Sequence, residues 1–95
     1  MKILIAFELT NPAQTKDQIV EKIKSFGDHL KITSNCYLVI SDSDPVTIRN
    51  QLKEVCYFNY DNNDILFVAD LSKDGKAAWN GLTENTGNWI RAFFQ

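Results

Sequence analysis

The residue best suited to chemistry is Glu8, a carboxylate at the end of an apolar N-terminal segment. Residues 2–9 alternate in character, which predicts a strand with one bulky core face and a second face that ends in Glu8. Two such carboxylates, one from each copy across a dimer axis, are oxygen ligands of the kind that divalent cations prefer. A cation held there can activate water for phosphodiester cleavage. The simpler interpretation is a solvated acid at a strand end.

Two other titratable residues have a weaker case. Asp70 is predicted near a strand end, on the face of Leu66 and Val68, where apolar neighbours can perturb the pKa of a carboxyl group. A strand-end or turn role explains it equally well. His29 is the single histidine and follows a predicted helix C-terminus, where the helix dipole favours it. No serine, cysteine or aspartate stands at a spacing that suggests a catalytic triad with it.

Composition narrows the classes of function. The chain has 10 basic and 12 acidic residues and a net charge of −2, which argues against tight, sequence-blind binding of nucleic acid through a row of cations. Arg49 and Lys53, four residues apart on a predicted helix, can meet a phosphate, although a solvated helix face is simpler. The two cysteines, Cys36 and Cys56, lie in apolar stretches and do not match zinc-ligand spacing.

The elements that position these residues follow from apolar periodicity and turn signals. Thr15 and Gln18 form a capping box for the first helix, and Asp44 followed by Pro45 begins the second. The pattern predicts strands at 2–9, 30–33, 36–41 and 64–71, helices at 16–26 and 45–56, and a turn at 59–63. The order is βαββαβ, which predicts an α+β, ferredoxin-like fold with one antiparallel sheet and both helices on one face. The whole chain, 1–95, is one domain, with a core at 1–71 and a C-terminal, tryptophan-containing extension at 72–95.

The opposite face of this sheet carries apolar residues such as Leu4 and Ala6. A bare apolar face predicts a partner, most simply a second copy of the chain, and so a homodimer. The extension is expected to open a short helix near 83–87 and to cover the sheet or clasp the dimer through Trp79, Trp89 and Phe93. Stacking of these aromatic side chains and Phe94 on nucleotide bases is the alternative.

The apolar N-terminal segment is too short for a membrane span and is closed by Glu8. We therefore expect a cytoplasmic protein that does not contact a membrane.

Three stretches taken together resemble a known family: residues 5–9 with Asn11-Pro12, residues 34–40, and residues 64–71 followed by the segment 77–81 and Trp89. The chain looks like the small bacterial proteins labelled "SinR family". These are similar to the ferredoxin-like nuclease subunit of the CRISPR adaptation complex. The resemblance spans nearly the whole chain and implies a ferredoxin-like homodimer.

In the nuclease family, an aspartate after an aromatic residue at the end of the first strand is the proposed metal-binding catalytic residue. The matching position is Glu8, after Phe7, so the resemblance implies a site for Mg²⁺ or Mn²⁺ shared by two subunits. Glutamate displaces the carboxylate by about 1 Å, and such a shift can cost about 100-fold in rate. The leading hypothesis is therefore a homodimeric module for protein or nucleic-acid association without robust catalysis. The alternatives are a metal-dependent endonuclease using Glu8 and a regulatory domain that binds a small ligand in the dimer cleft.

Overall fold

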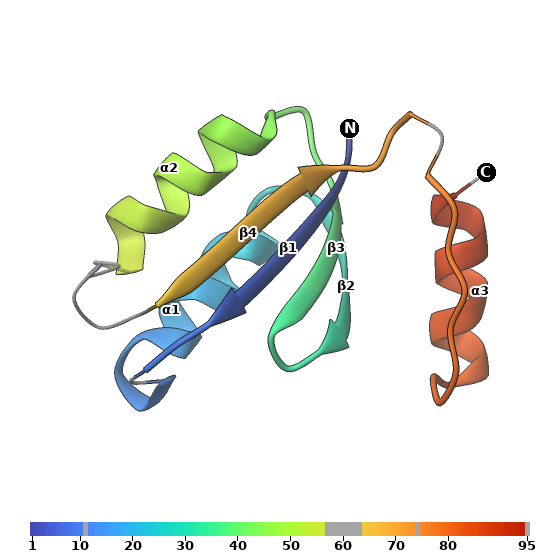
Figure 1. Ribbon diagram of the computed structural model, residues 1–95, viewed down its shortest axis with the longest axis horizontal. Coiled ribbons are helices and arrows are strands. Elements are labelled where there is room, and N and C mark those ends of the chain that lie inside the picture. Colours follow the sequence, from blue (N-terminus) through green and yellow to red (C-terminus); the bar gives the residue numbers. More distant parts are fainter. Residues whose placement is uncertain (11, 57–63, 74, 95) are drawn as a thin grey trace.

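The computed structural model describes residues 1–10, 12–56, 64–73 and 75–94, and it describes the backbone alone at 12–14, 55 and 56. Seven elements follow one another along these residues (Figure 1). They are β1 (Lys2–Glu8), α1 (Pro12–Lys24), β2 (Asp28–Thr33), β3 (Cys36–Ile40), α2 (Pro45–Cys56), β4 (Ile65–Asp70) and α3 (Glu84–Phe93).

The strands form a single four-stranded antiparallel sheet in the order β2-β3-β1-β4. The α+β class, the antiparallel sheet and the βαββαβ order of elements are therefore confirmed. β1 is central, and its residue Ala6 pairs with Cys36 of β3 on one side and with Phe67 of β4 on the other. The N-terminal segment thus forms the middle of the fold and is hydrogen-bonded along both edges.

The first helix starts earlier than its sequence indicates. α1 begins at Pro12, so the capping box at Thr15 and Gln18 lies inside the helix and the predicted start at residue 16 is wrong. Proline is favoured in a first helical turn because the N–H that it lacks would have no partner there. The helix also ends at Lys24 instead of residue 26.

The second helix has the predicted bounds, and its cap is the predicted one. The Asp44 carboxylate accepts a hydrogen bond of 2.8 Å from the backbone N–H of Thr47. Hydrogen bonds from Thr47 lower the pKa of Asp44, because they stabilise the charged carboxylate. Asp44 therefore caps the first turn of α2.

The strands differ from their predicted bounds by one or two residues at their ends. β2 begins at Asp28, two residues early, while β1, β3 and β4 each end one residue before the predicted limit. β4 also begins one residue late, at Ile65. The predicted turn at 59–63 and the side chain of Cys56 lie outside the described residues.

One face of the sheet packs against α1 and α2. This first cluster is built from the bulky face of β1, from β3 and from the apolar stripes of the two helices. Its buried members are Ile3, Ile5, Phe7, Ile19, Ile23, Tyr37, Val39, Ile48 and Leu52. The alternate apolar residues of the strands therefore pack against the apolar stripes of the two helices in one core, as the sequence predicts.

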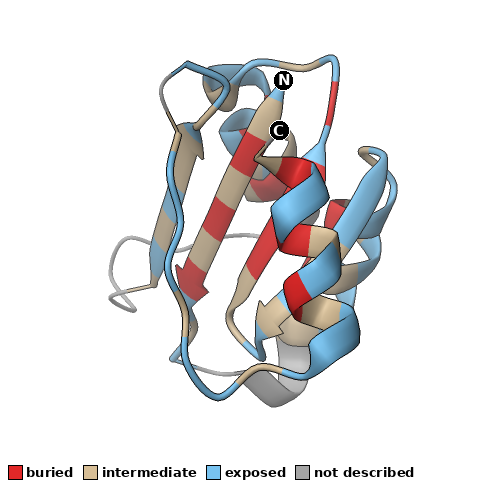
Figure 2. Ribbon diagram, turned by 90° about the vertical axis from the view of Figure 1, so that its right-hand side faces the viewer, coloured by how far each residue is buried: buried red, intermediate tan, exposed pale blue. Residues whose placement is uncertain are grey.

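The other face is covered in part by the C-terminal extension, and the expectation of a wholly bare face is wrong. Ile90 and Phe93 of α3 are buried against Leu38 of β3, and Leu4 packs against the same group. Figure 2 shows α3 lying in front of the sheet, with buried residues on its inner side. The helix begins at Glu84 behind an N-cap, Thr83, within the stretch predicted to open it. The molecule thus has a second apolar cluster that uses residues beyond the βαββαβ unit.

Within the described residues, no helix is both long enough and apolar enough to cross a membrane.

Candidate functional site

The extension leaves its face of the sheet open at the end of β1 and the start of β4. We define the open corner as Ala6, Glu8, Ile65 and Phe67. Glu8 pairs with Ile65 and Ala6 with Phe67, so these four side chains share the face opposite α1 and α2. Ile65 is 59% exposed and Phe67 is 57% exposed. In Figure 1 the sheet diverges from α3 toward this end of β1, which explains why the extension does not reach it.

Local hydrogen bonds hold the strand end that carries Glu8. Both the backbone N–H and the hydroxyl of Thr10 donate to one carboxylate oxygen of Asp64, each at 2.7 Å. The backbone N–H of Phe7 donates to the carbonyl of Asn35 at 3.0 Å. Glu8 is therefore an exposed carboxylate between two residues, Phe7 and Thr10, whose backbone N–H groups are hydrogen-bonded. The Asp64 carboxylate is not available to a ligand in the same way, because it accepts both hydrogen bonds from Thr10.

One copy of the chain does not supply a metal site at this corner. Among the described residues, no three histidine, cysteine, aspartate or glutamate side chains come together in a group that could hold an ion. Glu8 contributes one carboxylate, whereas Mg²⁺ needs near-octahedral oxygen coordination, usually from one or two carboxylates and several waters. The residues present fit a divalent cation only if a second copy brings its own Glu8 to the same place.

The structure places the other two titratable candidates away from Glu8. Asp70 is exposed at the opposite end of β4 and accepts a 2.9 Å hydrogen bond from the backbone N–H of Ser72. Hydrogen bonds from the side chain and the backbone of Ser72 lower the pKa of Asp70, which is the behaviour of a turn residue. His29 lies on β2 and not directly after a helix, and its Nδ1 is 3.1 Å from the carbonyl oxygen of Gly27.

Cys36 is a free, half-buried thiol on β3, and burial raises its pKa. A thiol with a raised pKa is a poor nucleophile at neutral pH, in agreement with its predicted packing role. Arg49 is exposed and donates from its guanidinium to the side-chain oxygen of Asn50.

The aromatic residues of the extension pack against one another. Trp89 stacks on Phe93 with ring centroids 5.3 Å apart, and Phe94 meets Phe93 edge-on at 4.9 Å. Trp79 lies against Gly87, where an added Cβ would come within 3.3 Å of the indole nitrogen. The guanidinium of Arg91 is 5.2 Å from the Trp79 ring centroid. These rings form the covering layer of the sheet and do not present a row of free faces to nucleotide bases.

The structure also forms a groove that the sequence patterns did not reveal. It lies between α1 and β2 and is lined by Lys16, Asp17, Val20, Glu21, Lys24, His29, Lys31 and Tyr37. Two sequence patterns correspond to this groove. On α1, the residues Lys16, Val20 and Lys24 are spaced four apart and so lie on one side of the helix. On β2, the residues that face α1 are polar. Neither pattern alone distinguishes a groove from a solvated surface.

The chain matches no protein-family profile and is similar to no curated protein. Its function must therefore be argued from the open corner, the covered face and the groove.

Proposed function

We propose that this chain is a homodimeric association module that docks a second copy of itself on the open corner, and that its fold is ferredoxin-like. The observation that supports the proposal is the exposure of Ile65 and Phe67, 59% and 57%, side by side with Ala6 on the sheet face that α3 covers in part. Large apolar side chains clustered on one surface patch are typical of contact sites.

A second copy is the simplest occupant, because the corner is complementary to itself. Across a two-fold axis each apolar side chain meets the same kind of side chain, which is the geometry of an isologous interface. A dimer also adds buried apolar surface to a chain of 95 residues, a size at which a single core gives modest stability. The small size of the corner favours a dissociation constant on the order of micromolar.

The order of the strands supports the ferredoxin-like arrangement. Counted from the edge formed by β4, the order is β4-β1-β3-β2, and α1 and α2 pack on the same face. Each βαβ half then contributes two non-adjacent strands to the sheet, as in the split βαβ motif.

Replacing Phe67 with serine is expected to weaken the dimer at least 30-fold, about 2 kcal/mol, because truncating a central aromatic side chain at an interface costs that much or more. Phe67 is exposed in the single chain, so the substitution leaves the core intact. Sedimentation equilibrium over a dilution series measures the change, with a mass of twice 10.9 kDa expected for the wild type.

Val46→Ser is the matched comparison, because Val46 is 55% exposed but belongs to α2. It is expected to leave the dimer unchanged. If Val46→Ser weakens the dimer as much as Phe67→Ser, the contact runs along the outer edge of β4 and not over the open corner. A wild type that stays at the mass of one chain throughout would remove the proposal.

A metal-dependent endonuclease is the second candidate, favoured by the position of Glu8 within the open corner. A two-fold axis through this corner would bring two Glu8 carboxylates close together. Like charges held near one another repel, and a divalent cation between them removes that repulsion. Bound Mg²⁺ or Mn²⁺ would supply an activated water for phosphodiester cleavage, while Glu8 from each copy holds the cation.

Glu8→Ala is expected to abolish any Mn²⁺-dependent cleavage of labelled RNA or duplex DNA. It should also abolish any strengthening of the dimer by Mn²⁺ relative to EDTA. Asp70→Ala, which removes a carboxylate at the other end of β4 and on the opposite face of the sheet, should change neither. Absence of cleavage beyond a buffer blank would eliminate the nuclease and leave the association module in place.

A further inference from the structure

The α1 side of β2 is polar, and this opens a groove. His29 pairs with Val39 and Lys31 with Tyr37, so His29 and Lys31 face the same side of the sheet as the first apolar cluster. Both are exposed, whereas Leu30 and Ile32 on the other side of β2 pack toward the C-terminal extension. Among the described residues, the first apolar cluster therefore extends only as far as β3, and β2 contributes no side chain to it. A groove of about 580 Å³ remains between α1 and β2.

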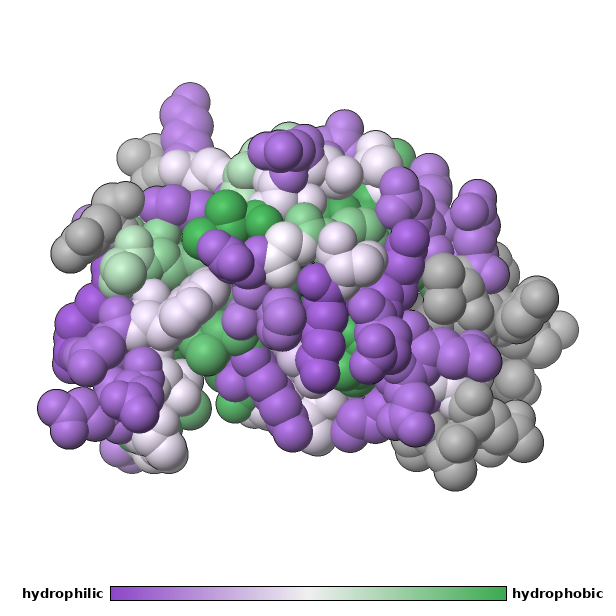
Figure 3. Space-filling view, turned by 180° about the vertical axis from the view of Figure 1, so that it is seen from behind, coloured by the Kyte–Doolittle hydropathy of each residue, from purple (hydrophilic) through white to green (hydrophobic). Residues whose placement is uncertain are grey.

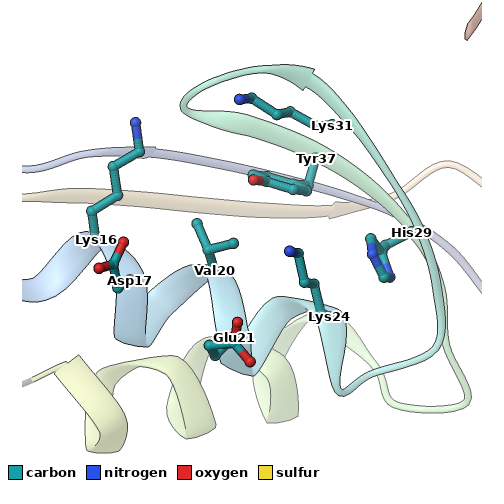
Figure 4. Close-up of a pocket in the computed structure, with 8 residues that line it drawn as sticks. All are labelled: Lys16, Asp17, Val20, Glu21, Lys24, His29, Lys31 and Tyr37. Carbon is teal, nitrogen blue, oxygen red and sulfur yellow. The ribbon is translucent and has the colours of Figure 1, made fainter.

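Cations from two elements converge on this groove. Lys16 and Lys24 lie two turns apart on α1, on either side of Val20, while Lys31 comes from β2. Figure 4 shows Lys16 and Lys24 rising from the helix toward the strand that carries Lys31. The hydroxyl of Tyr37 lies between them, at the floor of the groove.

The groove has unused hydrogen-bond donors. Within the described ranges, none of these three lysines is paired with a carboxylate, and the Tyr37 hydroxyl has no hydrogen-bond partner. No buried side-chain oxygen or nitrogen among the described residues lacks a partner, so the Tyr37 hydroxyl reaches solvent in the groove. Burial raises the pKa of Tyr37, which keeps the phenol protonated and able to donate.

The charge balance of the lining favours an anion. Three lysines face two carboxylates, Asp17 and Glu21, which gives a surplus of one positive charge. His29 also lines the groove, and its Nδ1 lies 3.1 Å from the carbonyl oxygen of Gly27, so Nε2 is the ring nitrogen available to a ligand. Figure 4 shows Glu21 on the helix side of the groove, away from Lys31.

We propose that this groove binds the phosphate group of a small phosphorylated molecule, with Lys24, Lys31 and the Tyr37 hydroxyl as donors. Its volume, about 580 Å³, falls within the range typical of small-molecule sites. Ammonium groups form strong, charge-assisted hydrogen bonds with phosphate oxygens, and the hydroxyl adds a neutral donor. The site lies within one chain and does not depend on the dimer.

A nucleic-acid backbone fits this surface less well than a compact phosphate. Backbone binding needs cations spread along a path, whereas these lysines line a single groove together with Asp17 and Glu21. The back of the molecule, where α1 and β2 lie (Figure 1), is largely hydrophilic in Figure 3. In the groove itself, Asp17 and Glu21 lie among the lysines on α1.

Titration with inorganic pyrophosphate, followed by NMR, tests the proposal. We expect saturable shifts of the His29 and Tyr37 ring signals with a dissociation constant below about 1 mM. Lys31→Gln should weaken binding about tenfold or more, because a charged hydrogen bond is lost, and Lys31→Arg should restore most of it.

Lys22→Gln is the matched control. Lys22 is on the same helix but lies outside the groove, with its ammonium 5.7 Å from the Phe26 ring centroid. It should change pyrophosphate affinity less than about twofold, well below the effect of a lost charged hydrogen bond. Equal losses for Lys22→Gln and Lys31→Gln, or shifts that do not saturate, would overturn the proposal. An RNA oligonucleotide that displaces pyrophosphate and binds more tightly would show that nucleic acid is the occupant.

Discussion

Replacing Phe93 with alanine is expected to destabilise the protein by about 3–5 kcal/mol, the usual cost of deleting a buried aromatic side chain. Phe93 is 2% exposed and joins α3 to the sheet through the second apolar cluster. It stacks on Trp89, meets Phe94 edge-on, and has the ammonium of Lys2 6.0 Å from its ring centroid. Its loss would therefore loosen the whole covering layer.

Urea unfolding of Phe93→Ala and wild type measures this difference in the free energy of unfolding. Asn85→Ala is the matched control, because Asn85 is exposed on the same helix and should change stability by less than about 0.5 kcal/mol. Binding of a hydrophobic dye should rise in Phe93→Ala under native conditions, because the sheet face under α3 becomes accessible. A loss below about 1 kcal/mol, typical of a surface position, would contradict a structural role for the extension.

Gly27→Ala is expected to cost more than about 3 kcal/mol, because it combines backbone strain with a steric clash. Gly27 has φ of +150°, a conformation that residues with a side chain rarely adopt. An added Cβ would also collide with the carbonyl oxygen of Ile40 on β3. The chain passes that carbonyl as it turns from α1 into β2, so the neighbouring backbone would have to move.

Gly81→Ala separates the two contributions. Gly81 also has a positive φ, +86°, but an added Cβ there meets nothing within 4 Å. Gly81→Ala should therefore lower the free energy of unfolding only by the cost of backbone strain, about 1–2 kcal/mol. Thermal unfolding of the two variants gives the comparison. Equal losses at Gly27 and Gly81 would show that the approach to Ile40 carries no cost.

The pattern of apolar residues was enough to predict the sheet and both core helices. β1 and α2 were predicted to within one residue because strict alternation marks the first, and an aspartate followed by proline marks the second. α1 was placed too late because the capping box at Thr15 is a local signal. The helix instead begins at Pro12, and this start depends on the path that the chain takes after β1.

The site was harder to predict, because it depends on which parts of a face the extension covers. Alternation placed Leu4 and Ala6 on the same bare face, yet α3 covers Leu4 and leaves the corner beside Ala6 open. The path of residues 75–82 determines that Leu4 is covered and that the corner beside Ala6 is open. The spacing of residues in the sequence does not encode that path. The groove was missed for a related reason: Lys24 and Lys31 line the same groove only because the chain turns at Gly27 and brings β2 alongside α1.

An NMR dilution series of methyl signals tests whether a second copy of the chain docks on the open corner, because it reports on the corner residues themselves. We expect the methyl signals of Ala6 and Ile65 to shift together with protein concentration and to follow one dimerisation constant. Ile32 and Leu82 pack in the cluster under the extension, and their signals should stay fixed. Concentration-dependent shifts at Ile32 and Leu82 without any at Ala6 and Ile65, or no shifts at all, would contradict the account.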